Sequence, residues 1–205
     1  MTLAALSESS ADEAAARILA EAIASTAVTW VGPPPFRSRG WPAVRGQLPT
    51  VIRHLHYQTR ATALIVVIDS NDSPLHDVTH IGKPQADCRL CTLRTIADRT
   101  LAELTRIARR PALRVALGAA TPAIEAWYLC GKPPNPSEQT WVRGGPRGYD
   151  KQSLKRAAYG TDRANLPLMT AVAKVEAERL AANLGLLRRD FPRGFGALEA
   201  DILAL

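Results

Sequence analysis

Apolar residues along the chain fall into two kinds of pattern, short continuous runs and longer amphipathic stretches. The short runs predict buried strands, at residues 3–7, 27–32, 63–68 and 112–118. The amphipathic stretches repeat apolar residues three and four positions apart, which is typical of helices. The first helix should begin near Ala11, because Ser10 and Glu13 have capping-box spacing. Further helices are expected at about 42–58, 92–109, 121–131, 150–158, 166–183 and 196–205.

Residues 63–68, Ala-Leu-Ile-Val-Val-Ile, form the clearest strand. No polar residue alternates with the apolar ones, so this strand should be buried on both faces, as in a parallel sheet. Alternation of strands and helices predicts right-handed crossovers between parallel strands. The expected fold class is α/β: a parallel four-stranded sheet flanked by helices, with a C-terminal helical extension. We place the core at residues 1–131, and a basic loop with a helical subdomain at residues 132–205.

Composition narrows the class of protein without indicating its chemistry. Of the 205 residues, 46% are hydrophobic and 22% are charged, as in a globular domain. No apolar run approaches the ~20 residues of a membrane span, and no basic segment precedes the first apolar run. We therefore expect a cytoplasmic protein with no membrane partner. Three cysteines in that setting predict reduced thiols rather than disulfides.

Positive charge is concentrated in two parts of the chain, and the formal net charge is +7. No acid occurs between Glu21 and Asp69, a segment in which arginines alternate with aromatic residues. A second basic run spans residues 143–163. Arginine beside aromatic side chains can hold phosphates and stack on bases, so nucleic acid (DNA or RNA) is the partner that this pattern favours. A solvated basic face over core aromatics explains the pattern equally well.

Acids follow three of the predicted strands. Glu8 comes directly after the first strand, Asp69 and Asp72 after the third, and Glu125 after the fourth. Because ligands of parallel α/β sheets bind beyond the carboxyl ends of the strands, these carboxylates should meet at one functional edge. Clustered acids repel one another unless a cation lies among them, and hard oxygen ligands suit Mg²⁺ or Mn²⁺. Each acid taken alone is also explained by helix capping or by a local turn.

Five short segments resemble the Toprim domain family, in the form found in small bacterial nuclease-like proteins of mobile-element and defence loci. They are SESSADEAAARIL, IVVIDSND, ATPAIEAWYLCG, YDKQSLKRAAYGT and FPRGFGALEADI. The resemblance implies Mg²⁺-dependent phosphodiester chemistry on nucleic acid, as in topoisomerases, primases and the overcoming-lysogenization-defect nucleases. It also implies defence against phage as the setting, and a protein from the same locus as a second kind of partner.

By position, the resemblance makes Glu8 a general acid/base or metal ligand, Asp69 the leading metal ligand and Glu125 a third acid of the site. The second aspartate of the family's Asp-x-Asp motif is replaced by Asn71, and Asp72 follows one residue later. Either Asn71 is a neutral ligand or the loop uses Asp72. A neutral ligand would weaken Mg²⁺ binding and could reduce activity.

A cationic side chain usually complements such acids, because it offsets the charge that builds up on a phosphate in the transition state. Lys151 and Lys155 are the candidates, since they lie four residues apart on one predicted helical face. Both are equally explained as ordinary surface lysines.

The loop at residues 70–91 holds a second candidate site. His76 and His80 are four residues apart, and Cys88 and Cys91 are three residues apart. Imidazole and thiolate pairs at these spacings chelate tetrahedral Zn²⁺. A structural zinc would explain how a long loop stays ordered without a core of its own. Two loop histidines and a buried cysteine pair are the alternative.

The leading functional hypothesis is a Toprim-type nuclease that cuts DNA or RNA phosphodiesters with Mg²⁺ or Mn²⁺. The alternative is a catalytically degraded Toprim-like module that binds nucleic acid or a partner protein, and Asn71 is the residue that favours it. A small zinc-stapled interaction domain is the third hypothesis, which needs the four zinc ligands but not Glu8.

Overall fold

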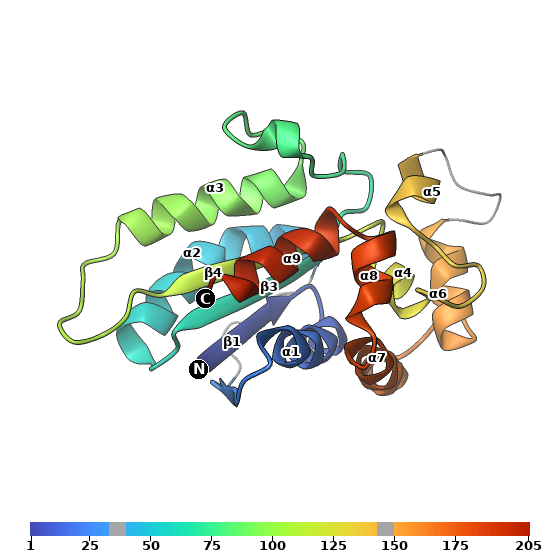
Figure 1. The fold of residues 1–205 in the computed structure, drawn as a ribbon, viewed down its shortest axis with the longest axis horizontal. Helices are drawn as coiled ribbons and strands as arrows, with labels where there is room; N and C mark the ends of the chain where they lie inside the picture. Colours follow the sequence, from blue (N-terminus) through green and yellow to red (C-terminus); the bar gives the residue numbers. More distant parts are fainter. Residues whose placement is uncertain (33–39, 143–149) are drawn as a thin grey trace.

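The computed structural model of the chain describes residues 1–32, 40–142 and 150–205. Its centre is a sheet of four parallel strands: β1 (Thr2–Ser7), β2 (Thr29–Trp30), β3 (Ala63–Asp69) and β4 (Arg114–Ala120). The strand order is β2-β1-β3-β4 (Figure 1). The predicted α/β fold with a parallel four-stranded sheet is therefore confirmed.

The position of β3 inside the sheet explains why its sequence is an unbroken apolar run. All of its residues are buried. Ile65 and Val67 pack into the core on one face of the sheet, whereas Leu64, Val66 and Ile68 pack into the core on the other. Because both faces are covered, a polar residue has no solvent to face at any of these positions.

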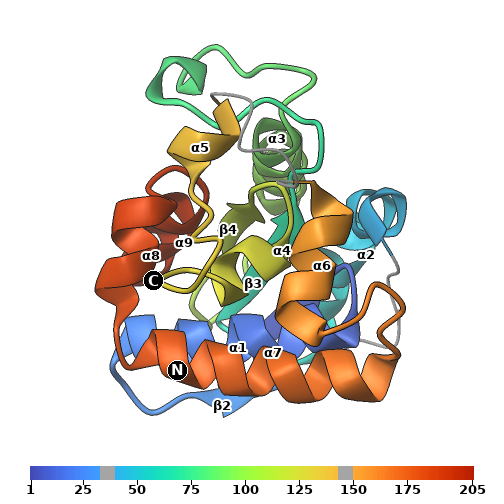
Figure 2. The ribbon, with the colours of Figure 1, turned by 90° about the vertical axis from the view of Figure 1, so that its right-hand side faces the viewer.

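Helices cover both faces of the sheet (Figure 1). One face carries α2 (Gly40–Gln58) and α3 (Arg89–Ala102), and α1 (Ser10–Ala24) lies on the other. The C-terminal part contributes α4 (Ile124–Tyr128), α5 (Glu138–Val142), α6 (Lys151–Tyr159), α7 (Leu166–Ala181), α8 (Leu184–Asp190) and α9 (Gly194–Leu203). Helix α7 lies along α1 (Figure 2), and residues of α7, α8 and α9 share one hydrophobic core with β1 and β3.

Several element boundaries differ from the predicted ones. Helix α3 ends at Ala102 rather than near residue 109, because the segment after it is bound to the end of α2. There the Thr105 N–H donates to the Tyr57 hydroxyl at 3.1 Å, and the Arg110 guanidinium donates to the His56 carbonyl at 2.6 Å. Strand β2 is shorter than predicted, β4 lies two residues later, and α5 and α8 lie where no helix was expected.

Both basic runs of the sequence extend into residues 33–39 and 143–149, which lie outside the described residues. On α2, Arg53 forms an ion pair with Glu103 at 2.7 Å, so this part of the first run is a paired surface charge. In the ranges that the structure describes, no helix is long and apolar enough to cross a membrane.

Candidate functional site

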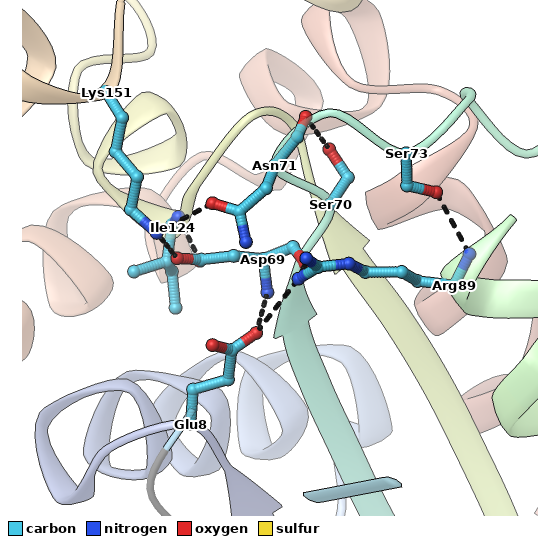
Figure 3. A network of polar contacts seen from close by, with 8 residues as sticks. All are labelled: Glu8, Asp69, Ser70, Asn71, Ser73, Arg89, Ile124 and Lys151. Carbon is cyan, nitrogen blue, oxygen red and sulfur yellow. Dashed lines mark hydrogen bonds and ion pairs between the residues drawn. The ribbon is translucent and has the colours of Figure 1, made fainter. Parts of the chain in front are cut away.

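The carboxyl ends of β1, β3 and β4 meet at one edge of the sheet, because these strands are parallel neighbours. Glu8 directly follows β1, Asp69 ends β3, and Glu125 lies in α4 after β4. Lys151, the first residue of α6, reaches the same edge from the C-terminal part of the chain. Figure 3 shows that Glu8 and Lys151 approach Asp69 from different sides.

Asp69 is the centre of this arrangement and is only 7% exposed. Its Oδ1 accepts a hydrogen bond from the Ile124 peptide N–H at 2.9 Å, and its Oδ2 accepts one from Lys151 Nζ at 2.6 Å. The peptide N–H of Asp69 donates to Glu8 Oε1 at 3.1 Å. Hydrogen bonds with a charged partner are the stronger ones, so Asp69 is held firmly at both its side chain and its backbone.

Glu8 lies between Asp69 and Arg89, the first residue of α3. Burial raises the pKa of the Glu8 carboxyl, and the charge of Asp69 raises it further, against the opposing effect of nearby N–H groups and cations. Arg89 Nη1 lies 3.7 Å from Glu8 Oε1 and donates to the Asp69 carbonyl oxygen at 2.9 Å. The Arg89 guanidinium also packs over the Trp41 ring, 4.9 Å from its centroid. The sequence prediction missed Arg89, because its role depends on contacts with residues distant in the chain.

Glu125 is a buried acid, only 3% exposed. The Tyr159 hydroxyl donates to its Oε1 at 3.1 Å, whereas its Oε2 has no hydrogen-bond partner among the described residues. Burial raises the pKa of the Glu125 carboxyl, and the charge of Asp69 raises it further. A buried oxygen without a partner is costly, and sites of function are where proteins accept such costs.

Asp12, in the first turn of α1, belongs to the same group of acids. Burial raises the pKa of its carboxyl to about 8, and the charges of Asp69, Glu125 and Glu8 contribute, while a hydrogen bond with Ser9 acts in the opposite direction. We call Glu8, Asp12, Asp69 and Glu125, together with Lys151, the acid centre.

Sequence reasoning missed Asp12 because an acid in the first turn of a helix usually serves the cap. The true N-cap of α1 is Ser9, whose Oγ accepts the Asp12 N–H at 3.2 Å. The predicted Ser10–Glu13 pairing is therefore wrong, and Glu13 instead pairs with Arg17 at 2.8 Å. Glu8 precedes the N-cap and lies outside the helix, so its spacing of four residues from Asp12 gives no signal that the two acids are neighbours.

Asn71 and Asp72, the two residues expected to supply a further metal ligand after β3, lie in different places. Lys151 Nζ donates to the Asn71 side-chain oxygen at 2.9 Å, so Asn71 adjoins the acid centre. Its φ of 47° is in the left-handed region, which asparagine tolerates better than most residues. Asp72 is exposed and lines a cavity of about 390 Å³ together with Trp41 and Arg45. The structure thus brings Asn71, and not Asp72, against Lys151.

Lys151 supplies a positive charge to the acid centre. Burial lowers its pKa, but its hydrogen bond and charge attraction to Asp69, with the charges of Glu125 and Glu8, outweigh that effect and raise it. The ammonium group is therefore charged at neutral pH. Lys155, the second candidate lysine, acts on Glu125 by lowering the pKa of that carboxyl.

The loop between β3 and α3 brings four potential metal ligands together. One atom each of His76, His80, Cys88 and Cys91 lies within 4.8 Å of all the others. Cys91 Sγ is 3.4 Å from Nδ1 of both histidines, and Cys88 Sγ is 3.7 Å from His76 Nδ1. Both thiols are buried, and both imidazoles are half-buried. We call these four residues the His/Cys cluster.

These separations fit a tetrahedral metal. Zinc bonds of about 2.3 Å to sulfur and about 2.05 Å to nitrogen, at tetrahedral angles, would place sulfur and nitrogen about 3.6 Å apart. Burial lowers the pKa of His76, which favours the neutral imidazole that a metal requires. Burial raises the pKa of the Cys88 thiol to about 11, against the opposing effect of the N–H groups of Cys91 and Leu90, so metal binding would have to displace this proton. By its donor set and its separations, the cluster could bind a structural metal such as zinc.

The third cysteine lies apart from this cluster. Cys130 is buried, and its thiol donates to Asp190 Oδ2 at 3.2 Å. In the part of the chain that the structure describes, the His/Cys cluster is the one group of three or more such ligands close enough to share an ion. The carboxyl groups of the acid centre do not form such a group, because their oxygen atoms lie farther apart.

Comparison of the chain with protein-family models, with curated proteins and with solved structures finds no match.

Proposed function

We propose that the acid centre catalyses metal-dependent cleavage of nucleic-acid phosphodiesters. The observation that carries this proposal is the gathering of carboxyl groups from separate strand ends around one lysine, with the pKa of Glu8, Asp12 and Glu125 raised. Burying like charges together opposes folding, and such arrangements are concentrated at functional sites. The carboxyl edge of a parallel sheet is also the usual place for a ligand.

Glu8 and Asp69 are the residues that would hold Mg²⁺ or Mn²⁺. Mg²⁺ is commonly bound through one or two carboxylates, with water and substrate oxygens as its other ligands, so it does not need a third acid close by. The buried Glu125 Oε2, which has no partner among the described residues, fits a site that accepts further hydrogen bonds. When bound, the ion would offset phosphate charge and lower the pKa of a water molecule.

The side chains of the acid centre have separate roles in this proposal. Where Asp69 alone holds the ion, Glu8, with its raised pKa, is suited to accept a proton from the attacking water. Lys151 has a side chain that is 38% exposed, so its ammonium can contact a phosphate oxygen as well as Asp69. A fixed cation at that position would stabilise negative charge in the transition state.

Charge and shape around the acid centre support nucleic acid as the substrate class. The chain carries a net charge of +7. Arg89, which contacts the acid centre, also lines the cavity of about 390 Å³, together with Trp41 and Arg45. Arginine and tryptophan can contact phosphate and stack on a base. Asp72 and Asp87 line the same cavity, and their charges oppose the attraction of the two arginines for a polyanion.

A second candidate function is a binding module without catalysis. One contact favours it: Lys151 Nζ already pairs with Asp69 Oδ2 at 2.6 Å and with the neutral Asn71 at 2.9 Å. A lysine in this position can replace a metal ion as the counter-charge of the acids. Such a module would bind nucleic acid or a partner protein through the same surface.

Incubation of the purified protein with labelled plasmid, single-stranded DNA and total RNA, with and without Mn²⁺, tests the proposal. We expect Mn²⁺-dependent cleavage of at least one polymer, lost in Glu8→Gln and retained in Asp98→Asn, a control acid exposed on α3. Calorimetric titration with Mn²⁺ separates the two candidates. Nucleic-acid binding without Mn²⁺ uptake or cleavage would support the binding module and reject the enzyme.

We also propose that the His/Cys cluster holds one zinc ion. The donor set and the sulfur–nitrogen separations of 3.4–3.7 Å support zinc. Elemental analysis of protein purified without chelator should give about one zinc per chain. A metal-free preparation that has the same melting temperature as a zinc-supplemented one would contradict this assignment.

A further inference from the structure

Arg89 connects the His/Cys cluster with the acid centre. It directly follows Cys88 and precedes Cys91 by two residues, so two potential metal ligands flank it in the chain. Its side chain extends toward the acid centre, where Nη1 donates to the Asp69 carbonyl at 2.9 Å and lies 3.7 Å from Glu8 Oε1 (Figure 3). One side chain therefore contacts the acid centre from a backbone position that two members of the cluster flank.

Further contacts set the direction of this side chain. The Arg89 peptide N–H donates to Ser73 Oγ at 2.9 Å, which ties the start of α3 to the beginning of the loop that follows β3 (Figure 3). The guanidinium is packed against Trp41 at 4.9 Å from the ring centroid, an arrangement that is favourable for a cation. A shift of the α3 N-terminus would alter all of these contacts together.

The loop that carries the cluster has little apolar support of its own. Residues 81–87 are all exposed, and the two large apolar side chains nearby, Val78 and Ile81, are 77% and 76% exposed. The buried side chains at the base of the loop include Cys88 and Cys91. A long loop without a core needs another source of order, and a bound metal would supply it.

We infer that a zinc ion in the His/Cys cluster holds Arg89 against Glu8 and Asp69, so that metal loading of the loop controls the geometry of the acid centre. Arg89 is then a positioning residue, since it keeps the Glu8 carboxylate aligned with the Asp69 N–H. Only the consequence for catalysis rests on the proposed nuclease function. The coupling between the two sites is a property of the protein without substrate.

Trp41 provides a readout of this coupling, because the environment of its ring includes the Arg89 guanidinium. Tryptophan emission of the full-length, zinc-loaded protein is recorded in Mg²⁺-free buffer, then after EDTA, and again after Zn²⁺ is restored. We expect a reversible change in emission in the wild type that is absent in Trp41→Phe and in Arg89→Ala. Arg89→Ala should still bind as much zinc as the wild type.

Two cysteine variants provide matched controls. Cys91→Ser should lose zinc and show the emission of the EDTA-treated wild type. Cys130→Ser changes the third cysteine, which lies outside the cluster, and should keep both the zinc and the EDTA response. If Cys91→Ser does not fold, the wild-type titration with EDTA and Zn²⁺ decides. Unchanged emission on zinc removal, or a change that persists in Trp41→Phe, would overturn the coupling.

Activity measurements separate this inference from the proposed function. In a nuclease, Arg89→Ala should lower kcat by ~10–100-fold, the usual effect of losing a group that orients a ligand, with little change in KM. Arg89→Lys keeps a cation beside Glu8 and should recover part of the loss. Absence of any cleavage by the wild type would reject the nuclease, whereas a zinc-dependent emission change would still establish the coupling.

Discussion

The acid centre and the His/Cys cluster lie on either side of Arg89, but they are built in opposite ways. The residues of the acid centre come from the end of β3, from the segments after β1 and β4 and from α6, and these elements are held by the core of the sheet. The cluster is local, since its ligands lie in one loop and the first turn of α3. The acids repel one another, whereas the imidazoles and thiols converge at separations that suit one ion.

The two regions should therefore respond differently when their main interaction is removed, because the fold holds the acid centre and a metal ion would hold the cluster. The fold imposes the acid centre against its electrostatic cost, so neutralising an acid there should remove function and leave the fold intact or more stable. The cluster should behave in the reverse way, because its loop needs the ion for order. Removing zinc should therefore lower the stability of the protein, in addition to releasing Arg89 from the acid centre.

The largest expected effect follows from neutralising Asp69. In the wild type, the Ile124 N–H donates to Asp69 Oδ1 at 2.9 Å, and Asp69→Asn keeps an oxygen that can accept this hydrogen bond. The substitution removes the charge that pairs with Lys151. We expect cleavage of the nucleic-acid substrate to fall by at least ~10²-fold, as when a principal transition-state contact is lost. Thermal unfolding should be unchanged or shifted upward.

Asp98→Asn on α3 is the control for this prediction, because it removes the same charge from an exposed position. It should leave both cleavage and melting temperature unchanged. Full activity in Asp69→Asn would reject the assignment of Asp69 as a metal ligand. It would also mean that the cleavage does not depend on the acid centre as proposed.

Zinc removal should have the next largest effect, and it acts on stability. EDTA treatment in Mg²⁺-free buffer should lower the melting temperature by ~5–10 °C, which for a domain of this size corresponds to about 2–3 kcal/mol. Differential scanning calorimetry measures the shift, and restoring Zn²⁺ should reverse it. Cys130→Ser should show the same shift as the wild type, whereas a Cys91→Ser protein should show none.

The two regions also differ in how far the sequence alone could predict them. The His/Cys cluster depends on spacings within one loop, so all four of its members, between His76 and Cys91, were predictable from the sequence. The parallel sheet was predictable because the run at residues 63–68 is apolar at every position. Asp12 and Arg89 were not predictable, since their roles arise from contacts across the fold with Asp69 and Glu8. The end of α3 was also missed, because hydrogen bonds to α2 outweigh its local helical pattern.

A smaller effect is expected from the pH dependence of stability, through Asp12. Its pKa is raised to about 8 in the folded protein, from an ordinary value near 4 in the unfolded chain. The folded state therefore binds the proton more tightly, and stability should be fullest below about pH 4 and be lost as pH rises through about 8. Asp12→Asn should raise the melting temperature at pH 8 by ~2–4 °C and have little effect at pH 4.

Thermal scans from pH 4 to pH 9, in zinc-containing buffer without Mg²⁺, measure this dependence. Ser9→Ala is a useful companion variant, since Ser9 caps α1 and hydrogen-bonds with Asp12. Loss of the cap should lower the melting temperature at every pH. If the melting temperature of Asp12→Asn changes with pH in parallel with that of the wild type, the Asp12 carboxyl is not the source of the pH dependence of stability.

The smallest expected change comes from Asn71→Asp, which tests how the acid centre would hold a divalent ion. Aspartate also tolerates the left-handed backbone at φ 47°, so the turn should be preserved. The new charge would lie where Lys151 Nζ is now 2.9 Å from the Asn71 oxygen. Were Asn71 a neutral ligand, Mn²⁺ binding measured by calorimetry should tighten by ~3–10-fold, the change that about 1 kcal/mol of added attraction produces, and cleavage should rise with it.

Asp72→Ala should alter neither Mn²⁺ binding nor cleavage, because Asp72 is exposed in the cavity beside Trp41. The opposite outcome, in which Asp72→Ala removes Mn²⁺ binding and Asn71→Asp has no effect, would place the second ligand at Asp72 and require the loop after β3 to rearrange around the ion.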